Sequence, residues 1–357
     1  MSSKIRDQAT SIRKGEELAL GPLQAYLNDK LPEPGGKLEI QQFPSGFSNL
    51  TYLLRFGKQE WVLRRPPFGA NIKNAHDMGR EHHVLSNLIA VYPKVPRPLL
   101  YCEDESVIGA PFYVMQRVQG AILRKQPPKG LDLSPELMKR LSESFVDNLV
   151  ELHRVDFAAA GLSELGRPEG YIARQVTGWT RRYRNAQTDE IAEIDQVMAW
   201  LADNMPAEMS AALIHNDYKY DNVVLDPADL TRIVAVLDWE MATLGDPLMD
   251  LATTLSYWAE KDEPAPLVFG PTALPGNMNR MQLVDRYQER SGLEVANPVF
   301  YFVFGLFKLA VIVQQIYARY QKGHTRDERF ANLIHGVRAC ATLAGTAVDK
   351  DRIYELI

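Results

Sequence analysis

Three polar residues in the segment 213–225, LIHNDYKYDNVVL, have a spacing that suits phosphoryl transfer. His215, Asp217 and Asn222 follow the pattern H-x-D-x-x-x-x-N between two apolar runs. An aspartate beside an attacking hydroxyl can orient it or accept its proton, and a nearby amide oxygen can bind Mg²⁺ without adding a full charge. The alternative is a polar turn between strands, where aspartate and asparagine are common.

A further carboxylate, Asp238, ends the apolar run 233–237. A carboxylate at a strand end is well placed to bind a hard cation that bridges nucleotide phosphates. An aspartate that caps the following turn explains Asp238 equally well in isolation. Asp246 and Asp250 are interpreted as structural, with Asp246 as the N-cap before Pro247. The order of the two segments, a catalytic loop and then a metal loop, favours the functional interpretation.

The elements that must hold these residues form two groups. An amphipathic helix is predicted over about 16–31. Strand patterns at 38–43, 50–56, 60–67 and 112–118, with a helical segment over about 75–91 among them, complete roughly the first third of the chain. Helical periodicity then dominates, over 135–153, 172–184, 189–203 and from 250 onward, with two short strand patterns at 222–226 and 232–238. The predicted fold class is α+β in two lobes. Its predicted parts are a mobile N-terminal arm over 1–15, an N-lobe over 16–118 and a C-lobe over 119–357.

Together, HNDYKYDN and LDWEMATLGDPLMDLA resemble the aminoglycoside phosphotransferase-like family of kinases, and in detail the branch also found fused to acyl-CoA dehydrogenases. The resemblance extends from about Phe43 to Leu255. It implies a protein-kinase-like fold with a small β-rich N-lobe and a larger helical C-lobe, and ATP and Mg²⁺ as cofactors. The site that it implies consists of the catalytic aspartate Asp217, the Mg²⁺ ligands Asn222 and Asp238, and His215, which braces the catalytic loop.

One strand of the N-lobe can be compared with the same pattern. In WVLRRPP, alternation places Val62 and Arg64 on one face, which in kinases roofs the adenine and contacts phosphate. Arg64 stands where kinases usually carry lysine, and a planar guanidinium meets phosphate with a different geometry. Glu81 resembles the glutamate that pairs with this strand cation. An ion pair between Arg64 and Glu81 is therefore expected, with a solvated surface carboxylate as the alternative.

The remaining nucleotide contacts are expected from a turn and a hinge. The turn 44–49, PSGFSN, has a single glycine, so Ser48, Asn49 and backbone N–H groups would have to bind the phosphates. An ordinary hairpin turn is the alternative. Backbone groups around Gln116 to Val118, where the strand FYVMQRV would meet the hinge, are expected to bind adenine.

A basic and aromatic segment suggests what the acceptor carries. The stretch GWTRRYRN places Arg181 and Arg182 beside Trp179, a mixture that suits an anion with an apolar or aromatic portion. A solvated helix face is the alternative. Aminoglycosides are polycations and favour a cleft rich in carboxylates. The residues thus favour an anionic alcohol, and the resemblance adds a hydroxyacyl-CoA as a concrete candidate.

Composition limits the partners. The formal net charge of -5 provides no general attraction to nucleic acid or to an anionic membrane. The apolar stretch 299–313 contains Lys308 and is shorter than a membrane span of ~20 residues, so a buried helix is expected. Two distant cysteines and a polar N-terminus predict neither a disulfide framework nor a secretory signal, and favour the cytoplasm. The oligomeric state is not predicted.

These features predict an enzyme that moves the γ-phosphoryl group of ATP to a hydroxyl of a small molecule. A nucleotide-binding pseudokinase that regulates a partner protein stays open because of Arg64 and the glycine-poor turn. An aminoglycoside O-phosphotransferase is a further alternative. A protein kinase is disfavoured, because no segment resembles the region between D-F-G and A-P-E.

Overall fold

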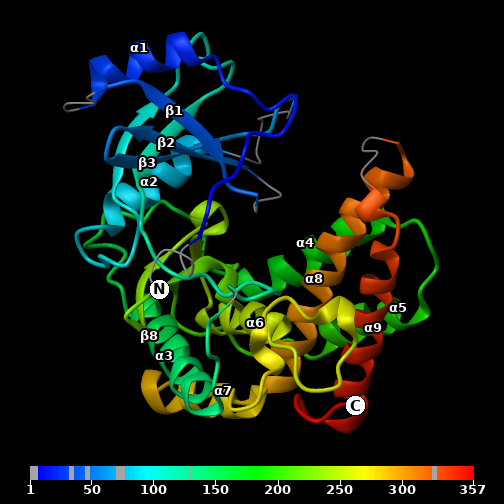
Figure 1. The fold of residues 1–357 in the computed structure, drawn as a ribbon. Helices are drawn as coiled ribbons and strands as arrows, with labels where there is room; N and C mark the ends of the chain where they lie inside the picture. The colour runs from blue at the N-terminus through cyan, green and yellow to red at the C-terminus, as the bar shows by residue number, and fades with distance from the viewer. Residues whose placement is uncertain (1–6, 32–35, 45–48, 70–76, 129, 324–327) are drawn as a thin grey trace.

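The computed structural model describes residues 7–31, 36–44, 49–69, 77–128, 130–323 and 328–357. It confirms the predicted fold class, a protein-kinase-like arrangement of two lobes. A five-stranded antiparallel sheet forms the N-terminal part, and helices form most of the C-terminal part. Figure 1 shows the N-terminal sheet, drawn in blue and cyan, above the helical part.

The N-terminal sheet has the strand order β1-β2-β3-β5-β4. Its strands are β1 (Leu38–Gln42), β2 (Leu50–Phe56), β3 (Gln59–Arg65), β4 (Pro98–Cys102) and β5 (Phe112–Gln116), with the helices α1 (Leu20–Lys30) and α2 (Met78–Leu88). The alternation predicted for β3 is present. Val62 packs into the main core, whereas Trp61 and Leu63 pack into a second cluster together with residues of α1. The face that carries Val62 and Arg64 is therefore the one available to the C-lobe.

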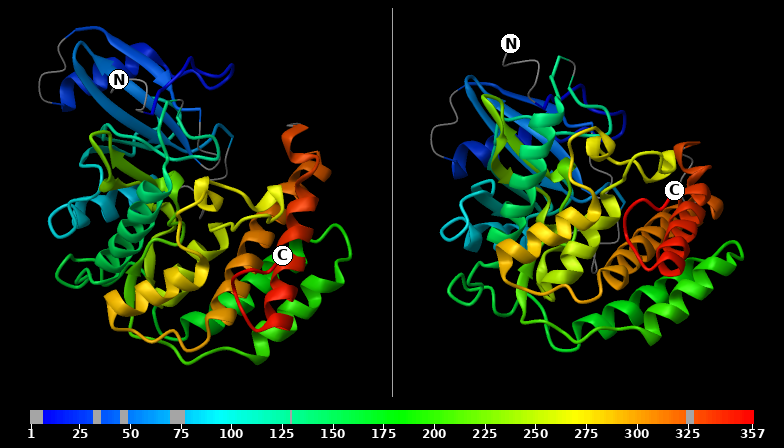
Figure 2. Two further views of the ribbon diagram at one scale, coloured as in Figure 1. Left: turned by 60° about the horizontal axis from the view of Figure 1, so that its bottom comes forward. Right: turned by 90° about the horizontal axis from the view of Figure 1, so that it is seen from below.

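The C-terminal part contains seven α-helices among the described residues: α3 (Pro135–His153), α4 (Tyr171–Ala186), α5 (Ala192–Asp203), α6 (Pro247–Tyr257), α7 (Arg280–Ser291), α8 (Pro298–Gln321) and α9 (Leu333–Lys350). Two small antiparallel ribbons lie between α5 and α6. The predicted one pairs β7 (Val223–Asp226) with β8 (Asp229–Val236), and the other pairs β6 (Ala212–Ile214) with β9 (Thr243–Gly245). The strands β6 and β9 were not predicted, because three residues are too few for alternation to be visible. Both views in Figure 2 place α8 and α9, in orange and red, side by side.

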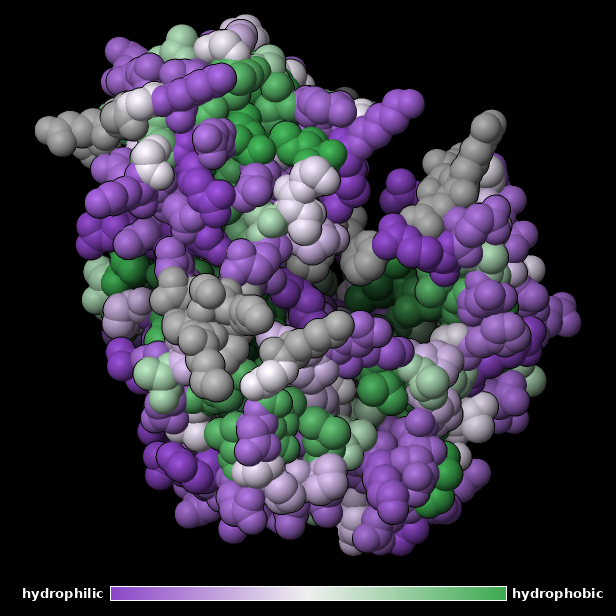
Figure 3. Space-filling view, viewed as in Figure 1, coloured by the Kyte–Doolittle hydropathy of each residue, from purple (hydrophilic) through white to green (hydrophobic). Residues whose placement is uncertain are grey.

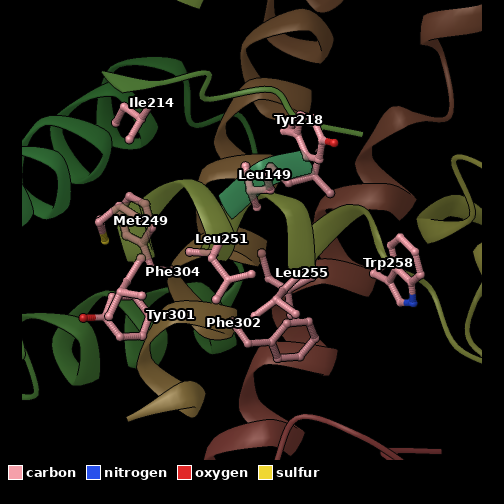
Figure 4. Packing of buried hydrophobic residues seen from close by; sticks show 14 of the residues in the cluster. Leu149, Ile214, Tyr218, Met249, Leu251, Leu255, Trp258, Tyr301, Phe302 and Phe304 are labelled. Carbon is pink, nitrogen blue, oxygen red and sulfur yellow. The ribbon is translucent and has the colours of Figure 1, made fainter. Parts of the chain in front are cut away.

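The helix α8 is the centre of the C-lobe core. Figure 4 shows Tyr301, Phe302 and Phe304 of α8 near Met249 and Leu251 of α6. By length and composition α8 could cross a membrane, but 78% of its most apolar window is buried inside the protein. The prediction of a buried helix over this stretch is therefore confirmed.

A close approach of two helices determines how α8 packs against α6. A Cβ added at Gly305 would lie 2.1 Å from the carbonyl oxygen of Ala252 in α6. Only glycine allows the two backbones to come this close. Both helices also contact the loop that carries Asp217, α6 through Asp250 and α8 through Lys308.

The described part of the N-terminal segment contacts both the sheet and the lobe junction. Thr10 forms an antiparallel bridge with Gln42 at the end of β1. Asp7 donates its backbone N–H to the carbonyl oxygen of Gly120 (3.1 Å), and Arg124 donates to its carboxylate (2.5 Å). The mobility expected for residues 1–15, and the lobe boundary at 118/119, stay predictions.

Candidate active site

A cleft of about 520 Å³ separates the two lobes and brings the predicted site residues together. Its N-lobe side includes Val62 and Arg64 of β3, and its C-lobe side includes Asp217, Asn222 and Asp238. Figure 3 shows the hollow between the N-lobe and the part of the molecule formed by α8 and α9, with hydrophobic residues gathered on the far wall. One cleft therefore joins a charged region to an apolar one.

The carboxylate of Asp217 is held in place by two neighbours from its own loop. The side-chain nitrogen of Asn222 donates to the Asp217 Oδ2 (2.8 Å) and to the Asp217 carbonyl oxygen (2.8 Å). The Lys219 Nζ lies 2.9 Å from each carboxylate oxygen. Burial alone would lower the pKa of Lys219, but Asp217, Tyr257 and Asp238 together outweigh burial and raise it. Lys219 is thus a fixed positive charge beside Asp217.

His215 joins the catalytic loop to the segment before Asp238. Its Nε2 lies 2.9 Å from the carbonyl oxygen of Leu237, and its Nδ1 accepts the backbone N–H of Asp217 (3.2 Å). A carbonyl oxygen can only accept, so Nε2 carries the hydrogen and Nδ1 is the acceptor. This arrangement is the one expected of a residue that braces the loop.

Asp250 of α6 supports the same loop from behind. Its two carboxylate oxygens accept the backbone N–H groups of His215 and Asn216, each at 2.7 Å. The ring of His153 contacts the same carboxylate at 3.1 Å. Burial would raise the pKa of Asp250, but His153 and His215 outweigh burial and lower it. The structural interpretation of Asp250 is confirmed, and so is that of Asp246, which caps α6 by accepting the N–H of Leu248 (2.8 Å).

The predicted ion pair between Arg64 and Glu81 is present. The two side chains are 2.9 Å apart, and a second guanidinium nitrogen of Arg64 donates to Asp238 (2.8 Å). Burial would lower the pKa of Arg64, but Asp238 and Glu81 together raise it. Glu81 also accepts the backbone N–H of Trp239 (3.2 Å), so α2, β3 and the segment after β8 meet at one point.

Two oxygen donors in the cleft fit a magnesium ion. Burial would raise the pKa of Asp238, but Arg64, Lys219 and His215 together outweigh burial and lower it, so the carboxylate is ionised at neutral pH. Asn222 uses its side-chain nitrogen on Asp217, which leaves the amide oxygen as the atom for a metal. An anionic oxygen and an amide oxygen are hard ligands of the kind that Mg²⁺ prefers. Asp238 also has a positive φ of 68°, an uncommon conformation that is concentrated at functional sites.

Three of the four residues predicted for the hinge and the turn line the cleft. Gln116 and Val118 both line the cleft, although the backbone N–H of Gln116 already donates to the carbonyl oxygen of Arg97 (2.8 Å). Asn49 also lines the cleft, and its side chain donates to Glu240 (2.6 Å). Ser48 lies outside the described residues.

The basic segment of α4 lies apart from the cleft walls. Trp179 is only 5% exposed, and the guanidinium of Arg182 stacks on its ring, 4.4 Å from the centroid. Arg181 is exposed. Among the described residues that line the cleft, none of these three is present. Their role in acceptor binding stays a prediction.

Two candidate site residues were missed at the sequence level. Lys219 follows Asp217 by two positions, so its place in the same loop was a usable signal. Tyr257, the last residue of α6, lines the cleft beneath Lys219, whose Nζ lies 4.6 Å from the ring centroid. Burial and Asp217 raise the pKa of the Tyr257 hydroxyl. Nothing in the sequence near Tyr257 indicates this position, because the end of α6 reaches the cleft only through packing.

The two lobes, the cleft between them and the cluster around Asp217 define the protein-kinase-like class. Within that class, the profile of the phosphotransferase enzyme family (APH) matches residues 39–281. The chain belongs to this family.

Similar proteins extend the comparison. Acyl-CoA dehydrogenase family member 11 from Gallus gallus is 37% identical over 92% of this chain, and the protein of that name from Rattus norvegicus is 38% identical over 86%. The matches span only 44% and 40% of the length of those two proteins. The matched region is therefore their APH-like region.

Solved structures agree on the fold. A structure described as a putative aminoglycoside phosphotransferase from Ralstonia eutropha JMP134 has a TM-score of 0.79 and 29% identity, covering 94% of this chain and 99% of that one. A thermostable variant of aminoglycoside phosphotransferase APH(4)-Ia, in ternary complex with AMP-PNP and hygromycin B, has a TM-score of 0.58 and 17% identity, covering 91% and 98%. The second likeness concerns the fold alone.

Proposed function

We propose that this phosphotransferase moves the γ-phosphoryl group of ATP to a hydroxyl of a small anionic molecule that has an apolar portion. The observation that carries the proposal is the convergence of Asp217, Asn222 and Asp238 with the Arg64–Glu81 pair on one cleft. An in-line transfer depends mainly on positioning and on neutralising charge, and these residues supply both. A cytoplasmic location stays a prediction.

Each residue has a distinct part in the proposed reaction. Asp217 orients the acceptor hydroxyl or takes its proton, while Asn222 and Lys219 keep its carboxylate in place. Asn222 and Asp238 would hold Mg²⁺, which neutralises charge on the phosphates. Arg64, fixed by Glu81, adds positive charge on the roof of the cleft. The hinge around Gln116 to Val118 would receive the adenine.

Binding of the metal can be tested apart from turnover. Asp238→Ala is expected to weaken Mg²⁺-dependent ATP binding by about tenfold or more, because it removes an anionic metal ligand, and Asn222→Ala should act more mildly. Calorimetric titration of ATP at several MgCl₂ concentrations measures the change. Asp226→Ala is the control, since Asp226 also ends a strand but pairs with Arg232 (3.3 Å) away from the cleft. Unchanged metal dependence in both site variants would contradict the assignment.

The apolar wall of the cleft supports an acceptor with a hydrocarbon portion. It consists of residues on one face of α8 and of two that follow, namely Leu309, Ile312, Val313, Ile316, Phe330 and Leu333. The sequence of α8 contains no aspartate or glutamate. A polycationic aminoglycoside would find no partner on this helix, whereas an acyl chain would bury apolar surface there, worth ~25 cal/mol per Å². The two relatives are named as acyl-CoA dehydrogenase family members, and a CoA thioester whose acyl chain carries a hydroxyl, a hydroxyacyl-CoA, is the concrete candidate that we propose from this.

The acceptor is tested by supplying alcohols and measuring ADP release, with mass detection of the product. A hydroxyacyl-CoA should be phosphorylated and kanamycin should not. Ile316→Asp should raise the acceptor KM by roughly tenfold or more without changing the KM for ATP, because it places a charge on the apolar wall. Gln315→Asp, on the same helix but outside the cleft lining, is the matched control. Efficient kanamycin phosphorylation, or equal behaviour of both variants, would overturn this acceptor class.

The role of the basic segment of α4 can be tested through the KM for the acceptor. If Arg181 and Arg182 contact the anionic end of the acceptor, neutralising both should also raise its KM. If they only form a solvated helix face, turnover should not change.

The pseudokinase alternative predicts ATP binding without hydrolysis, so slow ATP hydrolysis that depends on Asp217 would argue against it.

A further inference from the structure

A buried lysine outside the cleft lining contacts the catalytic loop. Lys308 of α8 is only 4% exposed. Its Nζ donates to the carbonyl oxygen of Asn216 (2.9 Å), to the Asn216 Oδ1 (3.3 Å) and to the Thr253 Oγ1 (3.0 Å). Asn216 immediately precedes Asp217. A buried charge with this many contacts to one loop residue requires an explanation, because burying a charge is costly.

The three partners of Lys308 identify its charge state. The Asn216 carbonyl oxygen can only accept, and the Asn216 amide oxygen accepts as well, since the amide nitrogen donates to the Met241 carbonyl (3.2 Å). The Thr253 hydroxyl gives its own hydrogen to the Met249 carbonyl (3.2 Å), so it too accepts from Lys308. Three acceptors require three hydrogens, and only the ammonium form has them. Burial lowers the pKa of Lys308 to about 8, against the opposing effect of Asp250 and Asp217, which keeps the ammonium in the majority at neutral pH.

The residue that Lys308 holds has a strained backbone. Asn216 has a positive φ of 66°, in the left-handed region that non-glycine residues seldom adopt. Such a conformation persists only where surrounding contacts impose it. Asp250 binds the N–H of Asn216 (2.7 Å), and Lys308 binds its carbonyl oxygen, so the peptide groups on both sides of its Cα are fixed. The direction of the chain into Asp217 depends on this conformation.

We propose that Lys308 is a positioning residue: its ammonium holds Asn216 in the left-handed conformation that presents Asp217 to the cleft. The inference rests on the proposed phosphotransferase function and assigns that function a residue outside the cleft. It also connects two parts of the site. Lys308 lies next to Leu309, so the helix that forms the apolar wall also anchors the catalytic loop.

The first test removes the charge and keeps the length of the side chain. Lys308→Met should lower ADP release from MgATP by roughly tenfold or more, while the Kd for MgADP, measured by calorimetry, stays within about twofold. Hydrogen exchange at the amides of Asn216 and Asp217 should become faster. Gln314→Met is the matched control: Gln314 is a buried polar residue of α8 that donates to the Ala186 carbonyl (2.8 Å), away from the loop. It should lower the melting temperature without changing turnover.

The second test separates positioning from general stability. Glycine adopts a positive φ without strain, so Asn216→Gly should reduce the need for the lysine. The double variant Lys308→Met with Asn216→Gly should recover most of the lost turnover, although it should not recover the lost melting temperature. Losses that simply add, or unchanged hydrogen exchange in Lys308→Met, would overturn the inference. Complete absence of ATP turnover in the unaltered protein would instead contradict the proposed function, and the exchange measurement would still decide the role of Lys308.

Discussion

Asp217→Asn is expected to lower phosphoryl transfer by roughly 10²-fold or more, because proton acceptance and positioning by a catalytic carboxylate are worth about that much. The amide has nearly the same shape, and its oxygen can still accept from Asn222. The fold and the affinity for MgATP should therefore change little. The measurement is single-turnover product formation beside calorimetric binding of MgADP.

A nearby carboxylate provides the control for Asp217. Asp221 also lines the cleft, close enough to Lys219 for the two charges to interact. Asp221→Asn should lower the rate of phosphoryl transfer far less than Asp217→Asn, because Asp217 is the carboxylate that Asn222 and Lys219 both bind in the described catalytic loop. Equal losses of activity in the two variants would show that the rate depends on the total negative charge in the cleft and not on one positioned carboxylate. Normal turnover in Asp217→Asn would remove Asp217 from the proposed mechanism.

Arg64→Ala is expected to abolish most activity and to destabilise the protein by roughly 3–5 kcal/mol, because removing one partner of a buried ion pair leaves the other charge without compensation. Glu81 is fully buried, so it cannot turn to solvent. Arg64→Lys should retain partial activity, because lysine keeps the positive charge and loses only the planar geometry of the guanidinium group. Urea unfolding and ADP release measure the two effects separately.

A second substitution distinguishes the two roles of Arg64. Arg64→Ala leaves both Glu81 and Asp238 without this cation. Adding Glu81→Gln removes the more deeply buried of the two charges and should recover part of the free energy of unfolding. Activity should stay low, because the positive charge on the roof of the cleft is still missing. Full activity in this double variant would contradict a role for Arg64 in nucleotide binding.

The chemistry of the catalytic loop and the general architecture could be predicted from the sequence. The pattern from His215 to Asn222 is local, and the loop is short enough that Asn222 can reach back to Asp217. The alternation of β3 correctly predicted which face carries Arg64, because side chains in a strand alternate whatever packs against it. Helix periodicity gave the bounds of α3 as observed, and α1 and α2 within a few residues. Strands β6 and β9 were missed, since three residues carry no pattern.

The sequence by itself determined the residues that carry charge and the local geometry of each element. Only the tertiary structure decided how those elements meet. It placed Asp238, from a distant segment, within hydrogen-bonding distance of Arg64, which also forms the predicted pair with Glu81. It also turned one face of α8 toward the cleft and directed Lys308 at Asn216. The physical reason is that periodicity reports which side of an element is buried, whereas the choice of neighbour depends on side-chain packing between elements far apart in the chain.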